Sequence, residues 1–553
     1  MILIARLIDL NIVKHNFLQG QGDARTTRVV SVPSFRGMII DRNNQPLAIT
    51  IPVVSVWINP HEFDIHTDNI AQLLKLTNSH FSDIKQKLAK VENKDFMYLA
   101  RDLDPSIGAQ ITALHIPGIY LQKDYRRYYP EGPASAHILG FTNVDDHGQE
   151  GLEMAYDQWL QGQPGLEKVL KDRYGNTVAD EQTIRQQQPG RNLQLSIDNR
   201  IQYIAYTELL NGVQQFHATS GSAVVLNIKT GEILAMTNVP SYDPNMRPTH
   251  EDDRYRNRAV TDVFEPGSTI KTFAVETALA SGKFTPYSTV NTSPGWIMVD
   301  GKKVDDDGYN NGVVDLTTIL KVSSNVGMTK VILNTQNHAL YNTLHSLGFG
   351  QTTASEFPGE RSGELINRPI WSPFVLATLS FGYGISVTTL QLAQAYATLA
   401  NDGVKTPVTL LKMDQPAQGV QVLNPKICHE LLTMLESVLY DKGGTAPAAR
   451  IPGYYVTGKT GTARILGPHG YEKDHHNGMF VGIAPATNPQ LVVAIMIHDP
   501  QGGKYFGGDV AAPVFSRIMS QALRLLNIPP DNLNPTTTNS PSSTNNTQRN
   551  IDA

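Results

Sequence analysis

Short apolar stretches that alternate with polar residues dominate the first part of the chain, and longer apolar runs dominate the rest. Between about residues 20 and 215, stretches such as Gly37 to Ile40 and Val53 to Ile58 are broken by turn sequences such as Asn59-Pro60, which predicts short strands in a mixed region. Two apolar runs then flank Lys229-Thr230-Gly231. This pattern predicts a hairpin with which a sheet begins.

Helical spacing of apolar residues follows that hairpin. The pattern predicts three helices, of which the second is interrupted around Ser323: Ser268 to Ala280, Leu316 to Leu333 and Thr389 to Ala400. Thr388 and Gln391 have the spacing of a capping box at the start of the third helix. Strand-like runs return at 455–458, 479–483 and 491–497. The order predicts an α+β domain in which helices pack on an antiparallel sheet.

The two ends of the chain differ from the rest. Met1 to Leu10 is apolar but contains Arg6 and Asp9, and it is too short to span a bilayer, which requires about 20 residues. It also lacks the features of a cleavable signal peptide. Residues 530–553 contain no aromatic and almost no apolar residue, so we expect a disordered polar tail.

Composition narrows the possible functions. The chain has 553 residues, of which 40% are hydrophobic, enough for several domains. The net charge of -5 gives no basic surface for nucleic acid. Cys428 is the only cysteine, which excludes an intrachain disulfide and a cysteine metal cluster. His475 and His476 have no ligand partner at helical spacing and are interpreted as loop residues, so we expect neither a metal nor a cofactor.

Three short motifs occur in a fixed order: Ser268-Thr269-Ile270-Lys271, Ser323-Ser324-Asn325 and Lys459-Thr460-Gly461. Each also occurs elsewhere, at 82–85, 543–545 and 229–231, because triplets this short recur by composition alone. Taken alone, Ser268 is more simply explained as a helix cap. Only the first set combines the order, the spacing and the predicted elements that a nucleophilic site needs.

This set resembles the signature shared by class A β-lactamases and penicillin-binding proteins. Further stretches resemble class B penicillin-binding proteins, in particular the septal, division-specific type. They are Arg36 to Arg42 with Leu47-Ala48, Tyr129 to Gly132 with His137 and Gly140-Phe141, Gly151 to Glu153, Phe264 to Lys271, Ser380 to Gly384 and Asp499-Pro500. Together they cover nearly everything from about residue 25 to 528.

The resemblance implies an α+β fold, with a C-terminal transpeptidase domain related to serine β-lactamases and an elongated mixed α/β pedestal before it. The expected divisions are residues 1–22 as the remnant of a membrane anchor and linker, 23–218 as a pedestal of the dimerisation type, 219–529 as the transpeptidase domain, and 530–553 as the tail. Such proteins normally begin with a short cytoplasmic tail and one transmembrane helix, of which only Met1 to Leu10 resembles a part.

The implied activity is cross-linking of peptidoglycan. Ser268 would attack a D-alanyl-D-alanine stem peptide, and the amine of a diamino acid on a second stem would take the acyl group. Lys271, one turn after Ser268, can serve as the base only if burial and nearby cations such as Lys459 lower its pKa. Ser323 would relay a proton to the leaving amine and Asn325 would hold the substrate backbone, although Ser323 alone could equally be a capping residue.

The third motif would hold the substrate. Thr460 and Thr462 are two apart on a strand, so both hydroxyls can face a substrate carboxylate, while Gly461 allows close approach of another chain segment. The backbone N–H groups of Ser268 and, by resemblance, Thr462 would form the oxyanion hole.

The resemblance further implies β-lactam binding, anchoring in the bacterial inner membrane with a periplasmic catalytic domain, and a SEDS-type glycan polymerase and other divisome proteins as partners. Other activities stay open: a D,D-carboxypeptidase or β-lactamase-type hydrolase, a β-lactam sensor that transfers nothing, and a scaffold. The large N-terminal region argues against a compact β-lactamase.

Overall fold

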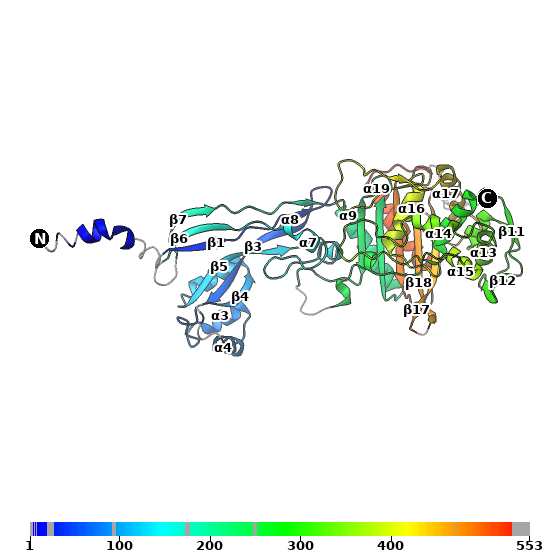
Figure 1. The fold of residues 1–553 in the computed structure, drawn as a ribbon. Coiled ribbons are helices and arrows are strands. Elements are labelled where there is room, and N and C mark those ends of the chain that lie inside the picture. The colour runs from blue at the N-terminus through cyan, green and yellow to red at the C-terminus, as the bar shows by residue number, and fades with distance from the viewer. Residues whose placement is uncertain are drawn as a thin grey trace, which may run out of the picture.

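The computed structural model describes residues 4, 6, 8–18, 27–90, 94, 96–171, 177–246, 252–468 and 470–532. An elongated N-terminal arm leads to a rounded C-terminal domain (Figure 1). No helix in these described ranges is long and apolar enough to cross a membrane. The N–H of Asn532 donates to the carbonyl of Gly453, so the first residues of the predicted tail contact the domain, whereas 533–553 lie outside the described residues.

Two sheets build the arm, and their strands pair antiparallel except for β2 and β8, which pair parallel. One has the order β1-β6-β7, and the other contains β3 with β5 on one side and β4 and β2 on the other, with β8 beyond β2. The strands are β1 (Thr27–Val32), β2 (Ile39–Ile40), β3 (Pro46–Ile58), β4 (Met97–Leu103), β5 (Ile119–Tyr128), β6 (Gly165–Lys171), β7 (Thr177–Arg185) and β8 (Leu193–Gln194). The strand predicted at 53–58 is longer in the structure because Pro52 pairs with Tyr125 of β5, while β4 joins only from Val54, so the missing N–H of Pro52 interrupts no ladder.

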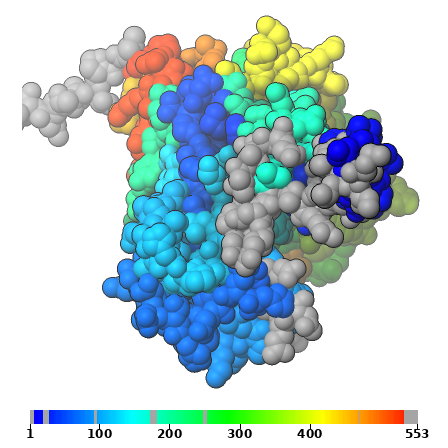
Figure 2. Space-filling view, turned by 90° about the vertical axis from the view of Figure 1, so that its left-hand side faces the viewer, coloured from blue at the N-terminus to red at the C-terminus, as the bar shows by residue number. Residues whose placement is uncertain are grey.

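A small head projects from the arm. Its core packs Val56 and Ile58 of β3 against Leu73 and Ile84, which lie on α3 (Ile70–Thr77) and α4 (Phe81–Ala89); α5 (Pro105–Ala113) completes the layer. Viewed along the arm, this head forms the blue lobe at the bottom of the molecule (Figure 2). It is a second hydrophobic core, separate from that of the C-terminal domain.

Buried charges join the pedestal segments that are far apart in sequence. The Glu153 carboxylate accepts from Arg36 Nε and from Arg127 Nε, each at 2.6 Å, and all three side chains are almost fully buried. Gly140 lies so close to the chain that a Cβ there would meet Glu150 O at 1.8 Å. These contacts bring together the segments that carry the family resemblance.

The C-terminal domain is built on a five-stranded antiparallel sheet, order β10-β9-β19-β18-β17. The strands are β9 (Ser220–Asn227), β10 (Ile233–Val239), β17 (Thr457–Gly467), β18 (Gly470–Ala484) and β19 (Leu491–His498). Nearly every residue of β9, β10 and β19 is buried, because helices cover both faces: α9 (Asn199–Gln215) and α19 (Ala512–Leu525) on one, α16 (Thr389–Ala400) on the other (Figure 1). The predicted α+β class is confirmed.

The predicted helices are present with informative differences. Helix α16 has the predicted bounds, and its Thr388–Gln391 capping box is formed. The helix predicted from Ser268 starts as a 3-10 turn, η4 (Gly267–Ile270), and becomes α11 (Lys271–Ala280). The interruption around Ser323 separates α12 (Leu316–Val322) from α13 (Asn325–Ile332).

Candidate active site

Three elements bring the motifs to one place. Ser268 lies on η4 at the head of α11, and Ser323 lies in the turn between α12 and α13. Lys459 lies on β17, the edge strand of the sheet, and η4 packs along that edge. The amines of Lys271 and Lys459 both lie 3.2 Å from the Ser323 hydroxyl, so the three motifs converge on that one oxygen.

Glycines allow the main chains around the site to meet. A Cβ on Gly461 would lie 2.8 Å from Pro266 O and 2.9 Å from Thr269 Cγ2. Gly267, with φ +52°, would place a Cβ 2.8 Å from Thr462 O, and one on Gly382 would lie 2.0 Å from Gly267 O. Side chains at Gly267 or Gly461 would therefore separate the nucleophile segment from the edge strand, as the sequence predicted for Gly461, and one at Gly382 would push its own segment away from Gly267.

Lys271 is fully buried. Its amine donates to the main-chain oxygen of Ser323 and, at 2.7 Å, to Asn325 Oδ1. Burial lowers the pKa of Lys271 from 10.5 to about 7, although Asp306 and Asp307 act in the opposite direction. A neutral amine has two N–H donors, so these two carbonyl oxygens can occupy both donors and leave the lone pair free to accept a proton.

Lys459 is the second buried amine of the site. Its amine also lies 3.3 Å from Thr460 O. Burial lowers the pKa of Lys459 well below its usual range, and repulsion from Lys271 lowers it further. If both amines next to the Ser323 hydroxyl were protonated, two positive charges would repel each other in a site shielded from water. The protonation of one amine therefore disfavours that of the other.

Ser323 has a left-handed backbone conformation, φ 60° and ψ 40°, which is uncommon for a residue with a side chain and is found at sites where geometry outweighs strain. Asp306 supports this turn from behind, accepting from Ser324 Oγ at 2.6 Å and from the N–H of Val326 at 2.8 Å. Ser324 also caps α13 through the N–H of Gly327. The turn is therefore held on its buried side while Ser323 faces the lysines.

Ser268 is half-buried, and its hydroxyl makes no hydrogen bond within the described part of the chain. The predicted contact with Lys271 is thus not formed as a direct hydrogen bond; the amine turns instead toward Ser323 and Asn325. Tyr396 fixes this segment from below, because its hydroxyl donates to Thr269 O at 2.8 Å. No local pattern in the sequence reveals this contact.

Thr460 and Thr462 both face the start of α18 (Gly507–Val510), as the strand period predicts. The N–H of Gly507 donates to Thr462 Oγ1 at 3.1 Å, and Thr460 Oγ1 lies 3.0 Å from Thr445 Oγ1. Thr460 Oγ1 also lies 3.4 Å from the Lys459 amine, whereas Thr462 Oγ1 has this one protein partner and keeps capacity for another.

His475 and His476 are not loop residues, because they lie within β18. His475 Nδ1 is 2.8 Å from Asp499 Oδ1, and the His476 ring stacks on Tyr505 at 4.2 Å between centroids. The loop prediction was wrong because the β17–β18 hairpin extends well beyond its apolar part. Among the described residues, no group of three or more His, Cys, Asp or Glu side chains could hold a metal ion.

Comparisons with known proteins agree with this architecture. Residues 221–520 match the penicillin-binding protein transpeptidase domain, and 31–195 match the penicillin-binding protein dimerisation domain. The chain is 42% identical over 528 residues to the probable peptidoglycan D,D-transpeptidase PbpC of Pseudomonas aeruginosa, covering 96% of this chain and 93% of the relative. It is 41% identical to the peptidoglycan D,D-transpeptidase FtsI of Escherichia coli K12, covering 96% and 90%.

Solved structures are similar as well. The transpeptidase domain of Burkholderia pseudomallei penicillin-binding protein 3 is 41% identical, with a TM-score of 0.56 over 61% of this chain and 97% of that one. Mycobacterium tuberculosis penicillin-binding protein 3 in complex with ampicillin is 28% identical, with a TM-score of 0.70 over 92% and 98%. A dimerisation domain followed by a transpeptidase domain defines a penicillin-binding protein. The chain belongs to the class B penicillin-binding proteins, the family of FtsI and PenA.

Proposed function

We propose that the chain is a septal peptidoglycan D,D-transpeptidase that works through an acyl-enzyme on Ser268. The observation that carries this proposal is the buried amine of Lys271, whose two N–H donors face carbonyl oxygens of Ser323 and Asn325 and whose pKa is lowered to about 7. Such an amine can accept the proton of a serine hydroxyl at neutral pH. An ordinary lysine cannot, because it stays protonated.

Acylation then follows from the arrangement. As Ser268 Oγ attacks the carbonyl carbon of the penultimate D-alanine, its proton passes to Lys271. The oxygen of that carbonyl becomes negative between the N–H groups of Ser268 and Thr462, which we assign as the oxyanion hole. Ser323, between the two amines, relays a proton to the leaving nitrogen, so the peptide C–N bond breaks and D-alanine departs with its amine restored.

Transfer reverses the proton path. The acceptor amine of a second stem attacks the Ser268 ester, its proton leaves through the same hydroxyl and amines, and Ser268 regains its hydrogen as the new amide forms. Thr460 and Thr462 are proposed to bind the terminal carboxylate of the donor stem. The Lys459 amine, 3.2 Å from Ser323 Oγ, can donate a hydrogen bond to the Ser323 hydroxyl or accept one from it during both acylation and transfer.

β-Lactams carry a carboxylate and a strained amide that mimic the donor stem, and the ampicillin complex of a relative supports their binding here. The names FtsI and PenA among the relatives support action at the division septum. We also propose a membrane-anchored protein with its catalytic domain in the periplasm, working with a SEDS-type glycan polymerase and other divisome proteins, as the family resemblance implies.

Mass spectrometry of the protein during incubation with penicillin tests the proposal. A persistent adduct on Ser268 is expected, together with amide product when a thioester donor and an amine acceptor are added. Rapid loss of the adduct would indicate a hydrolase, an adduct without amide product would indicate a sensor, and no adduct would indicate a scaffold.

Ser268→Ala should abolish the adduct and leave the fold intact. The Ser268 hydroxyl makes no capping hydrogen bond at the start of η4, so its removal takes away no such contact. Circular dichroism and thermal unfolding should therefore show a folded protein. An unchanged adduct in this variant would end the assignment of Ser268 as the nucleophile.

A further inference from the structure

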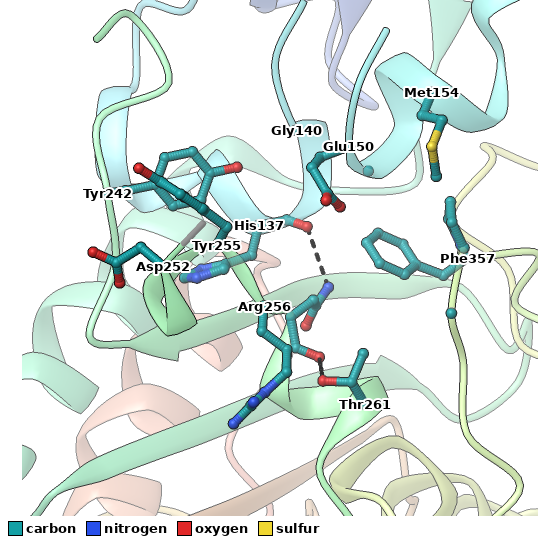
Figure 3. Close-up of a pocket in the computed structure, with 14 residues that line it drawn as sticks. His137, Gly140, Glu150, Met154, Tyr242, Asp252, Tyr255, Arg256, Thr261 and Phe357 are labelled. Carbon is teal, nitrogen blue, oxygen red and sulfur yellow. Dashed lines mark hydrogen bonds between the residues drawn. The ribbon is translucent and has the colours of Figure 1, made fainter. Parts of the chain in front are cut away.

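A cavity of about 370 Å³ lies between the pedestal and the transpeptidase domain (Figure 3). Glu150, directly before α7 (Gly151–Ala155), and Met154 on α7 line it from the pedestal side. Tyr242, Tyr255 and Phe357 line it from the transpeptidase side. It shares no lining residue with the site around Ser268, and its volume is within the range of small-ligand pockets.

Aromatic rings form much of its wall. The rings of Tyr242 and Tyr255 meet edge to face at 4.8 Å between centroids, and Phe357 lies on the opposite side of the cavity (Figure 3). The hydroxyl of Tyr242 donates to Ala136 O at 3.1 Å, which anchors this ring against the pedestal. Aromatic faces favour apolar groups and cations over anions.

One charge in this cavity lacks a counter-charge. Glu150 extends between the tyrosine pair and Phe357 (Figure 3), and its carboxylate forms no hydrogen bond or ion pair with any residue that the structure describes. Partial burial raises the pKa of Glu150. The side chain nevertheless remains accessible to solvent, so a ligand can reach it.

The other charged groups of the wall are already paired or neutral. Arg256 Nε lies 2.8 Å from Asp262 Oδ1, and Asp252 pairs with Arg254 at 2.7 Å. His137 Nε2 is 2.8 Å from Arg254 O, and burial lowers its pKa to about 4, so its imidazole is neutral at physiological pH. The cavity therefore presents one uncompensated negative charge among aromatic rings.

We propose that this cavity binds a primary ammonium group on an apolar stem, as in a lysine side chain, with Glu150 as the counter-ion and the Tyr242–Tyr255 pair and Phe357 around the stem. This site is separate from the D,D-transpeptidase reaction. Because its walls belong to both domains, an occupant that binds only the assembled junction stabilises it by mass action. The site thus offers a means by which a ligand could influence how the pedestal holds the catalytic domain.

A ligand-observed NMR titration of the full chain with Nα-acetyl-lysinamide tests the proposal, with the neutral Nα-acetyl-norleucinamide as matched ligand. We expect the ammonium ligand to bind about tenfold more tightly, and Glu150→Gln to remove that preference, as loss of a charge-assisted hydrogen bond predicts. Glu430→Gln on α17 (Pro425–Tyr440), outside the cavity, is the control and should change nothing. Equal binding of the two ligands, no binding, or wild-type binding by Glu150→Gln would overturn the proposal.

Two further arms complete the experiment. Acetyl-Gly-Lys-Gly-amide binds as well as lysinamide if the natural occupant is a lysine within a chain, whereas a requirement for the free amino-acid amide indicates a small molecule. Tyr255→Leu should weaken the ammonium ligand more than the neutral one, because a cation–π contact is lost; equal weakening would remove the aromatic part of the proposal. The rate of penicillin acylation of Glu150→Gln should equal that of the wild type. If the binding experiments refute the ammonium site, the proposed transpeptidase activity is therefore not affected.

Discussion

The rate of β-lactam acylation should rise with pH through a midpoint near 7, because only the neutral form of Lys271 can accept the serine proton. Burial lowers the pKa of this amine from 10.5 to about 7. At pH 7 about half of the molecules then carry a neutral amine, against about one in three thousand for an unperturbed lysine. The dry environment is therefore responsible for about three orders of magnitude in reactive population at neutral pH.

Asp307→Asn assigns that midpoint to the Lys271 site. The Asp307 carboxylate favours the charged amine, so its removal lowers the pKa of Lys271 and should move the profile to lower pH. The backbone at Asp307 has φ 52°, a left-handed conformation that asparagine also tolerates, so the substitution should leave the loop intact. Lys271→Arg should be nearly inactive at every pH, because a guanidinium stays protonated.

The assay is the second-order acylation rate with a fluorescent penicillin from pH 5.5 to 9. The apparent midpoint belongs to the coupled pair of Lys271 and Lys459, and the shift in Asp307→Asn separates the contribution of Lys271. A flat profile, a rise only near pH 10, or a shift of the variant to higher pH would refute the reasoning.

Three other substitutions test the surroundings. Gly461→Ala would place a Cβ 2.8 Å from Pro266 O. Separating the two segments should lower the free energy of unfolding by about 1 to 3 kcal/mol and slow acylation on the order of a hundredfold. An acylation rate equal to that of the wild type would mean that the close approach is unimportant. Thr462→Val should slow acylation by carboxylate-bearing β-lactams about tenfold to a hundredfold, and acylation by a neutral thioester much less. Loss of the acceptor for Gly507 N–H should slow both reactions alike. Equal slowing of the two reactions would contradict the carboxylate contact. Burial raises the pKa of Glu276 from 4.5 to about 7, so the folded state loses stability as pH rises from 4.5 to 7. Above pH 7, the unfolding free energy of Glu276→Gln should exceed that of the wild type by up to about 3 kcal/mol. A difference in unfolding free energy that does not depend on pH would disprove this.

Elements with local signals were predicted closely. Helix α16 has a capping box at its start and a glycine soon after its end, so both bounds follow from the sequence, and the Ser323 interruption was visible between two apolar stretches. The extension of β3 through Pro52 was not predictable, because it depends on which neighbour strand lies beside that residue. For the same reason, the position of the two histidines within β18 depends on a hairpin that the apolar pattern does not reveal.

Order and spacing selected the three motifs, which the structure brings together, but their mutual geometry was not predicted. The direct contact expected between Lys271 and Ser268 follows from helical periodicity, whereas the structure directs the amine to Ser323 and Asn325. Asp306 stands in a run of three acids that gives no sequence signal of burial, yet it is buried and holds the Ser324 turn. Contacts of this kind join residues that no local pattern connects.

The close packing at three glycines also lowers the pKa values of the two lysines in the site. Gly267, Gly382 and Gly461 let three main-chain segments meet with no side chain between them, and this closure leaves both Lys271 and Lys459 with no exposed surface. Exclusion of water is the largest cause of both lowered pKa values, so the glycines act on the base although none of them can carry a proton. A larger residue at any of the three positions should therefore slow acylation for two reasons. It displaces the nucleophile segment, and it admits water, which raises the pKa of Lys271 and favours its protonated form.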